Sequence, residues 1–445
     1  MTEGRKKTKQ SGYLVSFLGK HWKAVTVLVV ALVVLSCEGV LLLRKQRVPT
    51  TAKPAEAFFI PLRGPNMKLP QMYDYGPVLS TLERKPRVNL TTMGAELDAF
   101  ISKYNLRDNS STSWPHEELP FVAGSEGAAT TCRLNALCLA SLLVLHNVTR
   151  GTLPLELWVE APLPPERAAA LSALFGPRLR VRAFAETDAA YAARFGALEP
   201  ALFRNVFHRK VQTLASSAFA RVLWVDSDAF VLRDPRTALP ADAGLVLWRD
   251  MSVIDTRNPV WALLHTAPVA GYGGESGAVL VDKGRAGAAR ALQLAAYMNQ
   301  HQNAFYRLVY GDKDTFFLAA RALGVPSTLL PFLPTVVGRR SFLQAAPDGT
   351  PFFVHLPGPG KKDFVGAMHS ADPRGFWGRI PRFDPNSAHV GRVRGRLLAF
   401  ADSPSASIVD HDPAAVVGAE NIQLIHSMFK LAEDVLRRCD GTNTR

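Results

Sequence analysis

A run of twenty largely apolar residues near the N-terminus constrains this chain more than any other feature. Residues 24–43 read AVTVLVVALVVLSCEGVLLL. As a helix, such a run rises about 30 Å, which matches the thickness of the hydrocarbon core of a bilayer. A cleavable signal peptide has a shorter apolar core and a small-residue cleavage site, which fits this run less well. We therefore expect a transmembrane signal anchor over residues 24–43.

Basic residues flank this run and predict its orientation. Six of them precede it and three follow it closely, and residues 1–47 contain only two acidic residues, so half of the net charge of +14 lies around the apolar run. Because Lys and Arg stay on the cytoplasmic side, we expect residues 1–23 to be a cytoplasmic tail and the bulk of the chain to be lumenal. The charge distribution, with no basic stretch interleaved with aromatic residues, argues against a nucleic-acid-binding protein.

Glu38 is the one charged residue inside the apolar run. A carboxylate at the centre of a bilayer is costly, but this one lies about one and a half turns from the lumenal end of the predicted helix. Its side chain either reaches the interface or pairs with a second chain. A homo-oligomer formed through the membrane span is therefore left open.

Features further along the chain agree with a lumenal location. Three N-x-Ser/Thr sequons are present, at Asn89-Leu90-Thr91, Asn109-Ser110-Ser111 and Asn147-Val148-Thr149, and such triplets are glycosylation acceptors in secreted domains. A short tail followed by a span of about twenty residues is typical of the Golgi. We expect a single-pass type II protein of the Golgi membrane.

The cysteines decide little. Outside the apolar run only Cys132, Cys138 and Cys439 remain. If residues 132–138 are helical, the first two Cα atoms lie about 9 Å apart, which is too far for a disulfide. The odd number leaves one thiol without a partner, and no zinc-like spacing is present.

The rest of the chain divides into a stem and one α/β domain. Residues 44–115 lack a sustained period and are scattered with Pro, Thr and Ser, so we interpret them as a stem. From residue 116 to 445, helix and strand patterns alternate, which favours helices around a mainly parallel, Rossmann-like sheet. The expected helices cover residues 130–146, 165–175, 210–218, 311–323 and 422–436, with one more ending at 298, and the expected strands cover 155–160, 178–184, 221–225, 244–248 and 277–282.

A buried strand at residues 221–225 runs directly into Asp226-Ser227-Asp228. Alternate side chains of an extended chain share a face, so Asp226 and Asp228 can converge on one hard cation beyond the carboxyl end of the strand. A divalent ion there would bridge the diphosphate of a nucleotide sugar. Asp-x-Asp is also common in solvated turns, but the strand before it and the signal anchor upstream favour the metal site.

A histidine follows another strand and offers a third ligand. His355 closes the apolar stretch 352–354, and Lys361 comes six residues later after Gly358 and Gly360. A neutral imidazole at a strand end is a good metal ligand, and the lysine can meet a phosphate across the glycine-rich turn. His369 is the competing ligand, and we rank it second.

Several blocks, in order along residues 130–370, resemble the fungal-type α-1,3-mannosyltransferase family. They are residues 153–158, Lys210 to Asp228 with Asp234-Pro235, Glu275-Ser276-Gly277 with Val281-Asp282-Lys283, Gly311-Asp312-Lys313-Asp314-Thr315-Phe316, and Pro347 to Lys361. His355-x2-Gly358-x2-Lys361 is also similar to an element of retaining transferases of the glycogenin type. Residues 185–201 and those after 370 match no block. The resemblance implies a GT-A fold, a manganese ion, and GDP-mannose used with retention of configuration.

We assign substrate roles to five further residues, four of which lie within these blocks. Asp314 and Lys313 begin a predicted helix, where an acidic residue is also a common cap, and we expect Asp314 to touch the sugar. Glu275 is the second candidate for stabilising or attacking the anomeric carbon, although departure of the phosphate on the front face needs no protein nucleophile. Lys210 faces the diphosphate if its helix points at the site, and Asp250 is a candidate contact for acceptor hydroxyls.

These expectations combine into transfer of mannose from GDP-mannose to a glycan acceptor. Asp226, Asp228 and His355 would hold the metal, with Lys210, Lys313 and Lys361 around the donor. Two alternatives stay open: a UDP-hexose donor on the same fold, and a lumenal scaffold or carbohydrate-binding protein without turnover.

Overall fold

A computed structural model describes residues 89–439, except for 111–113, 199–206, 255, 270–271, 310, 333, 338–340, 371–375, 378–379, 382–389, 394–395, 400–407 and 410–416. The chain divides into two units, Met1–Ala55 and Glu56–Arg445, and all described residues belong to the second. The predicted tail, membrane span and most of the predicted stem lie outside them. Among the described residues, no helix is both long and apolar enough to cross a membrane.

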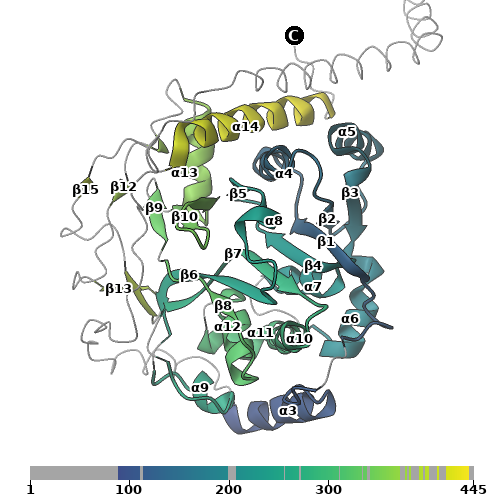
Figure 1. The fold of residues 1–445 in the computed structure, drawn as a ribbon, viewed down its shortest axis with the longest axis vertical. Coiled ribbons are helices and arrows are strands. Elements are labelled where there is room, and N and C mark those ends of the chain that lie inside the picture. Colours follow the sequence, from purple (N-terminus) through teal and green to yellow (C-terminus); the bar gives the residue numbers. More distant parts are fainter. Residues whose placement is uncertain are drawn as a thin grey trace, which may run out of the picture. The chain divides into compact units, whose positions relative to one another are not determined.

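A mixed sheet of nine strands forms the centre of this unit (Figure 1). Its path is β13-β14-β6-β7-β4-β1-β2-β3, and β8 pairs with β6. The strands are β1 (Val122–Thr131), β2 (Leu155–Val159), β3 (Leu179–Ala183), β4 (Phe219–Val225), β6 (Leu245–Val253), β7 (Tyr272–Asp282), β8 (Thr328–Leu329), β13 (Val390–Val393) and β14 (Arg396–Ala399). Neighbours among β3, β2, β1 and β4 are parallel, which confirms the predicted parallel α/β core, whereas β7 runs antiparallel between β4 and β6.

A second, antiparallel sheet adjoins the first, in the order β5-β11-β10-β9. Its strands are β5 (Ala229–Val231), β9 (Thr335–Val337), β10 (Ser341–Ala345) and β11 (Pro351–His355). A short pair, β12 (Ile380–Pro381) and β15 (Ile408–Val409), forms a third sheet. Only three residues separate β4 from β5, so the chain leaves the large sheet and enters the second one across Asp226, Ser227 and Asp228.

Helices cover both faces of the large sheet (Figure 1). They are α3 (Leu90–Lys103), α4 (Ala136–Val148), α5 (Pro165–Phe175), α6 (Asp188–Phe195), α7 (His208–Ser216), α8 (Pro235–Ala238), α9 (Val260–Leu263), α10 (Ala286–Gln300), α11 (Gln302–Leu308), α12 (Lys313–Ala322), α13 (Pro359–Met368) and α14 (Ala419–Cys439). Along β4, Val222 and Trp224 pack with α7, α10 and α12, whereas Leu223 and Val225 pack with α4, α14 and the second sheet. Burial on both faces explains why residues 222–225 of β4 are all apolar.

Helix α3 extends the folded unit into the stretch that we assigned to the stem. Met93, Leu97 and Ile101 recur at helical spacing and are buried in the same core cluster as α7 and α10. Trp114 is also buried there, and its indole nitrogen donates a hydrogen bond to the Leu119 carbonyl oxygen at 2.9 Å. The predicted domain boundary at residue 116 therefore leaves out α3, which packs with the domain. The amphipathic pattern of this helix is short and is surrounded by polar residues, so the sequence did not indicate it.

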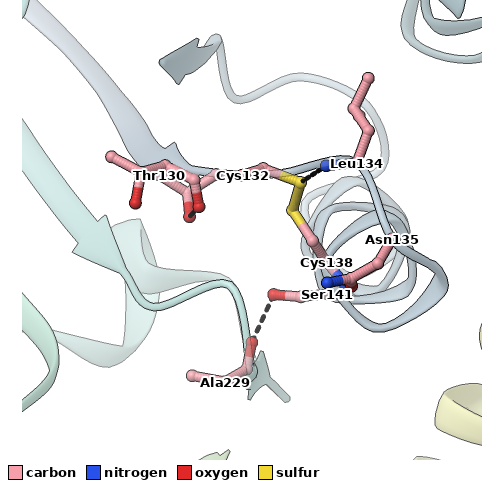
Figure 2. Close-up of a disulfide and its surroundings, with 8 residues drawn as sticks. Thr130, Cys132, Leu134, Asn135, Cys138, Ser141 and Ala229 are labelled. Atoms are coloured by element: carbon pink, nitrogen blue, oxygen red, sulfur yellow. Dashed lines mark hydrogen bonds between the residues drawn. A yellow bond between two sulfur atoms is a disulfide. The ribbon is translucent and has the colours of Figure 1, made fainter. Parts of the chain in front are cut away.

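Cys132 and Cys138 form a disulfide, contrary to our expectation (Figure 2). The expected helix over residues 130–146 begins only at Ala136, because β1 continues through Thr131. The intervening loop brings the two Cα atoms to 6.1 Å. Asn135 caps α4 by accepting a hydrogen bond from the Cys138 backbone nitrogen at 2.9 Å, and Ser141 donates to the Ala229 carbonyl oxygen at 2.5 Å. The bridge thus ties α4 to the segment that follows β1, and Ser141 ties the same helix to β5.

Replacing both bridged cysteines tests this contribution. The variant Cys132→Ser/Cys138→Ser should lower the free energy of unfolding by about 2 kcal/mol, because the bridge restricts a short loop of the unfolded chain. Chemical denaturation followed by circular dichroism measures the change. Cys439→Ser, which removes a cysteine outside the bridge, is the control and should leave the midpoint unchanged. Equal midpoints for wild type and double variant would contradict the prediction.

Candidate metal and donor site

Asp226, Asp228 and His355 converge at the carboxyl end of β4. One potential ligand atom from each lies within 4.8 Å of the other two. The His355 Nε2 atom is 3.5 Å from an oxygen of Asp226 and 3.7 Å from an oxygen of Asp228. The structure therefore brings together the three residues that we predicted as metal ligands.

Strand pairing brings the histidine to the two aspartates. In the antiparallel pair β5–β11, His355 lies opposite Ala229, which is the residue after Asp228. The Leu356 backbone nitrogen donates to the Asp228 carbonyl oxygen at 3.0 Å, and the Asp226 backbone nitrogen donates to the Gly277 carbonyl oxygen at 2.8 Å. The connection between β4 and β5 is thus fixed to a strand of each sheet.

Gly277 in β7 makes the close approach of His355 geometrically feasible. A Cβ atom at this position would lie 2.7 Å from the His355 Nδ1 atom and 3.1 Å from the ring of Phe353. Contacts that short are not tolerated without movement of one partner. A side chain on residue 277 would therefore displace the imidazole.

Glu275 holds the other side of the imidazole ring. Its Oε1 atom lies 3.0 Å from His355 Nδ1. Burial lowers the pKa of His355, but the carboxylates of Glu275 and Asp228 outweigh burial and raise it to about 9. Burial raises the pKa of Glu275, but His355 and the Gly277 amide outweigh it, so the net shift is downward. Without a metal, the pair is an ionised carboxylate beside an imidazolium.

Lys210 from α7 connects the metal-ligand aspartate to α12. Its ammonium group lies 3.0 Å from Asp226 and 2.9 Å from Asp312, and it donates to the carbonyl and hydroxyl oxygens of Ser276 at 2.8 and 2.7 Å. Burial lowers the pKa of Lys210, but Asp226 and Asp312 outweigh it and raise the pKa well above its usual value. Lys210 is thus surrounded by protein oxygens in the position where we had expected a diphosphate contact.

Three further predicted residues lie around this centre. The Lys361 ammonium group is 2.7 Å from Asp228, and its side chain is 45% exposed, so it can leave that carboxylate. Lys313 forms an ion pair with Asp250. Asp314 is buried in the first turn of α12.

His369, the competing ligand, does not join the cluster. Its Nε2 atom lies 2.5 Å from a carboxylate oxygen of Glu433 in α14, and its side chain is 56% exposed. It is the C-cap residue of α13. The structure thus favours His355 over His369 as the third ligand.

Sequence reasoning did not single out Asp312 or Ser276. Asp312 is buried, which raises the pKa of its carboxyl group above the usual value even though Lys210 opposes that change. It also accepts a hydrogen bond from the Ser276 hydroxyl at 3.0 Å. Both residues lie within the blocks that resemble the family, Ser276 directly after Glu275 and Asp312 two residues before Asp314. The identity of a buried partner depends on the pairing of β7 with α12, which the sequence does not show.

Negative charge exceeds positive charge among the residues gathered here. The carboxylates are Asp226, Asp228, Asp250, Glu275, Asp312 and Asp314, and the lysines are Lys210, Lys313 and Lys361. Buried carboxylates need compensating charge, because their desolvation is costly. Oxygen ligands with one imidazole suit a divalent cation such as Mn²⁺. The donor set therefore fits the predicted metal.

Comparison with known protein families supports a mannosyltransferase-like sequence over part of the chain. The model of a mannosyltransferase family, Mannosyl_trans3, matches residues 269–341. This segment contains β7, α10 and α12 and therefore includes Glu275, Asp312 and Asp314, but not Asp226 or Asp228. No curated protein matches the sequence.

Several solved structures are similar to parts of the chain. The bifunctional glycosyltransferase WbbM is 13% identical with a TM-score of 0.34, and the match covers 48% of this chain and 40% of that one. The galactosyltransferase LgtC, in complex with donor and acceptor sugar analogues, is 14% identical with a TM-score of 0.29, covering 44% and 69%. Core-mannan synthase A (CmsA/Ktr4) from Aspergillus fumigatus, in its Mn/GDP form, is 9% identical with a TM-score of 0.29, covering 46% and 72%. The chain thus spans less than half the length of WbbM.

Substitution of Gly277 by Ala should weaken metal binding. The added methyl group would push against His355 Nδ1, and we expect the affinity for Mn²⁺ to fall and the free energy of unfolding to decrease by about 1–3 kcal/mol. Titration of Mn²⁺ followed by electron paramagnetic resonance measures the affinity. Gly366→Ala in α13, where an added Cβ has no neighbour within 4 Å, should leave the Mn²⁺ affinity unchanged and raise the free energy of unfolding by about 0.5–1 kcal/mol, because alanine is the better helix former. Unaltered Mn²⁺ affinity in Gly277→Ala would show that His355 is not a ligand.

Metal affinity should also increase with pH. Because His355 has a pKa of about 9 without metal, Mn²⁺ must displace its proton, and the apparent Kd should fall about tenfold per unit between roughly pH 7 and 9. Calorimetry in buffers of different ionisation enthalpy detects the released proton. Without metal, the same group binds its proton more tightly in the folded state, so its stabilising contribution is complete below about pH 6.5 and is lost as pH rises through 9. Binding at pH 7 without proton release would contradict this assignment.

Proposed function

We propose that this protein is a divalent-metal-dependent glycosyltransferase with a GT-A fold that uses a nucleotide-sugar donor. The observation that carries the proposal is the convergence of Asp226, Asp228 and His355 beyond the carboxyl end of a buried parallel strand. Ligands of open α/β sheets bind at that end of the strands. The mannosyltransferase family match over residues 269–341 supports the same class of reaction.

Mannose from GDP-mannose is the donor that we propose, with retention of configuration and a glycan as acceptor. The support is the ordered resemblance of residues 130–370 to the fungal-type α-1,3-mannosyltransferase family, together with the shorter mannosyltransferase match. A UDP-hexose donor is the alternative, and a scaffold without turnover is the other. A scaffold without turnover does not account for three carboxylates around the His355 imidazole, whereas the UDP-hexose alternative would use the same metal site and differs only in its donor.

The metal ligands and the two lysines beside them would have distinct roles. Asp226, Asp228 and His355 would hold the ion, which when bound supplies Lewis-acid stabilisation of the departing diphosphate. Lys361, whose exposed side chain contacts Asp228, would exchange that carboxylate for a donor phosphate. Lys210 would keep Asp226 in place rather than meet the diphosphate directly, because its ammonium group already has protein oxygen partners.

The sugar would lie near the start of α12. Gly274 in β7 brings that strand close to α12, since a Cβ there would be 3.0 Å from the Lys313 carbonyl oxygen. Asp314 and the Lys313–Asp250 pair lie at this junction. We propose that Asp314 contacts the transferred sugar and that Asp250 faces the acceptor. Retention of configuration would need no carboxylate nucleophile in this arrangement, because the phosphate would leave and the acceptor would attack on the same face of the sugar.

A lumenal location remains part of the proposal. The disulfide between Cys132 and Cys138 is typical of secretory compartments, where thiols are oxidised. The signal anchor at residues 24–43 and the Golgi location rest on the sequence pattern alone.

Nucleotide release from a panel of donors tests the proposal. Full-length protein in detergent should release GDP from GDP-mannose in the presence of Mn²⁺, and chelation should abolish release. Asp228→Ala should reduce the rate more than about 100-fold, since even partners of metal ligands are worth about 10–100-fold. The matched control Asp242→Ala, which removes an exposed carboxylate elsewhere, should retain full activity.

Three outcomes would change the proposal. Hydrolysis of a UDP-sugar alone would replace the donor. Release that is indifferent to chelation would remove the metal from the reaction. Absence of both release and donor binding in the presence of Mn²⁺ would favour the scaffold.

A further inference from the structure

Glu275 is buried in β7 with one of its carboxylate oxygens bound three times. The Oε1 atom accepts hydrogen bonds from the backbone nitrogens of Ser276 at 2.9 Å and Gly277 at 2.7 Å, and it lies 3.0 Å from His355 Nδ1. Both amides belong to the residues that directly follow Glu275 in the same strand. The orientation of the carboxylate is therefore fixed by the backbone of its own strand, independently of its contact with the imidazole.

This contact decides which nitrogen of His355 faces the aspartates. With Nδ1 against Glu275, the ring directs Nε2 toward Asp226 and Asp228, at 3.5 and 3.7 Å. A hydrogen shared between Nδ1 and the carboxylate leaves the lone pair of the neutral ring on Nε2. Carboxylates that hold metal-ligating histidines in this way fix the ring orientation and make the ligand more basic.

Glu275 also connects the two sheets. It belongs to β7 of the large sheet, whereas His355 ends β11 of the second sheet. Gly277, two residues along, leaves room for the ring because a Cβ there would be 2.7 Å from Nδ1. The absence of a side chain at Gly277 allows the imidazole to approach β7, and the contact with Glu275 holds the ring there.

We propose that Glu275 is a positioning residue that acts through His355 and not on the sugar. This inference rests on the metal site of the proposed function, and it replaces our expectation that Glu275 attacks or stabilises the anomeric carbon. Its Oε1 atom is already bound by two amides and an imidazole, which hold the carboxylate against the histidine. A nucleophile needs a free, approachable oxygen, so this arrangement suits orientation better than attack.

The test measures Mn²⁺ binding by the full-length protein in detergent, without any donor. Glu275→Ala should weaken the affinity about 10–100-fold. Glu275→Gln, which keeps an oxygen acceptor for Nδ1, should restore most of that loss. Electron paramagnetic resonance of free Mn²⁺ gives the affinities, and circular dichroism with thermal melting reports whether each variant is folded. If Glu275→Ala does not fold, the Glu275→Gln variant carries the comparison, with a smaller loss expected.

A double variant separates positioning from an independent role. If Glu275 acts through His355, then adding Glu275→Ala to His355→Ala should not weaken Mn²⁺ binding further. Additive losses would overturn the proposal, and so would a Glu275→Ala variant that binds Mn²⁺ normally but no longer releases nucleotide. The matched control is Glu433→Gln, which alters another glutamate paired with a histidine, His369, and should leave Mn²⁺ binding unchanged.

Failure of the metal site itself would look different. In that case Asp228→Ala and His355→Ala would both bind Mn²⁺ as well as the wild type does. That result would contradict the proposed function, whereas normal binding by Glu275→Ala beside weakened binding by Asp228→Ala would contradict only the role of Glu275.

Discussion

The passage of the chain from one sheet to another at Asp226–Asp228 is the constraint on which the rest of the site depends. The Asp226 amide is bound to the carbonyl of Gly277 in the large sheet, and the Asp228 carbonyl is bound to the amide of Leu356 beside the second sheet. Because both ends are fixed, the positions at which the two side chains leave the backbone are set by the two sheets. The antiparallel pairing of β5 with β11 then places His355 beside them. The geometry of the candidate metal site therefore depends on these backbone hydrogen bonds and on this strand pairing.

Burial of charge is the cost of this arrangement, and paired side chains offset it. Lys210 is buried between Asp226 and Asp312, and Trp224 donates its indole hydrogen to Asp226 at 2.7 Å. A buried ion pair contributes little net stability, but removing one partner leaves an uncompensated charge. The network therefore serves mainly to keep the ligand oxygens in one orientation. The excess of carboxylates over lysines is the feature that an added divalent cation would neutralise.

Local patterns predicted well those parts of the fold whose structure is decided locally. The apolar run before Asp226 is buried on both faces as β4, and the predicted helix at residues 165–175 has those bounds in the structure. The helix expected over residues 130–146 exists, but its predicted start was wrong, because pairing of β1 with β2 and β4 extends the strand to Thr131 and the helix begins at Ala136. That single shift turned an unfavourable cysteine spacing into a disulfide. Boundaries of this kind depend on partners that are distant in the chain.

The sequence by itself determined which residue types could hold a cation, because two aspartates directly follow one apolar strand and a histidine ends another. Only the tertiary structure decided how the other charges are used. It placed Glu275 on the imidazole and Lys210 between Asp226 and Asp312. Periodicity reports which face a side chain shares with its neighbours in the chain. It does not report which strand or helix packs opposite that face, and a buried charged group takes its role from that partner.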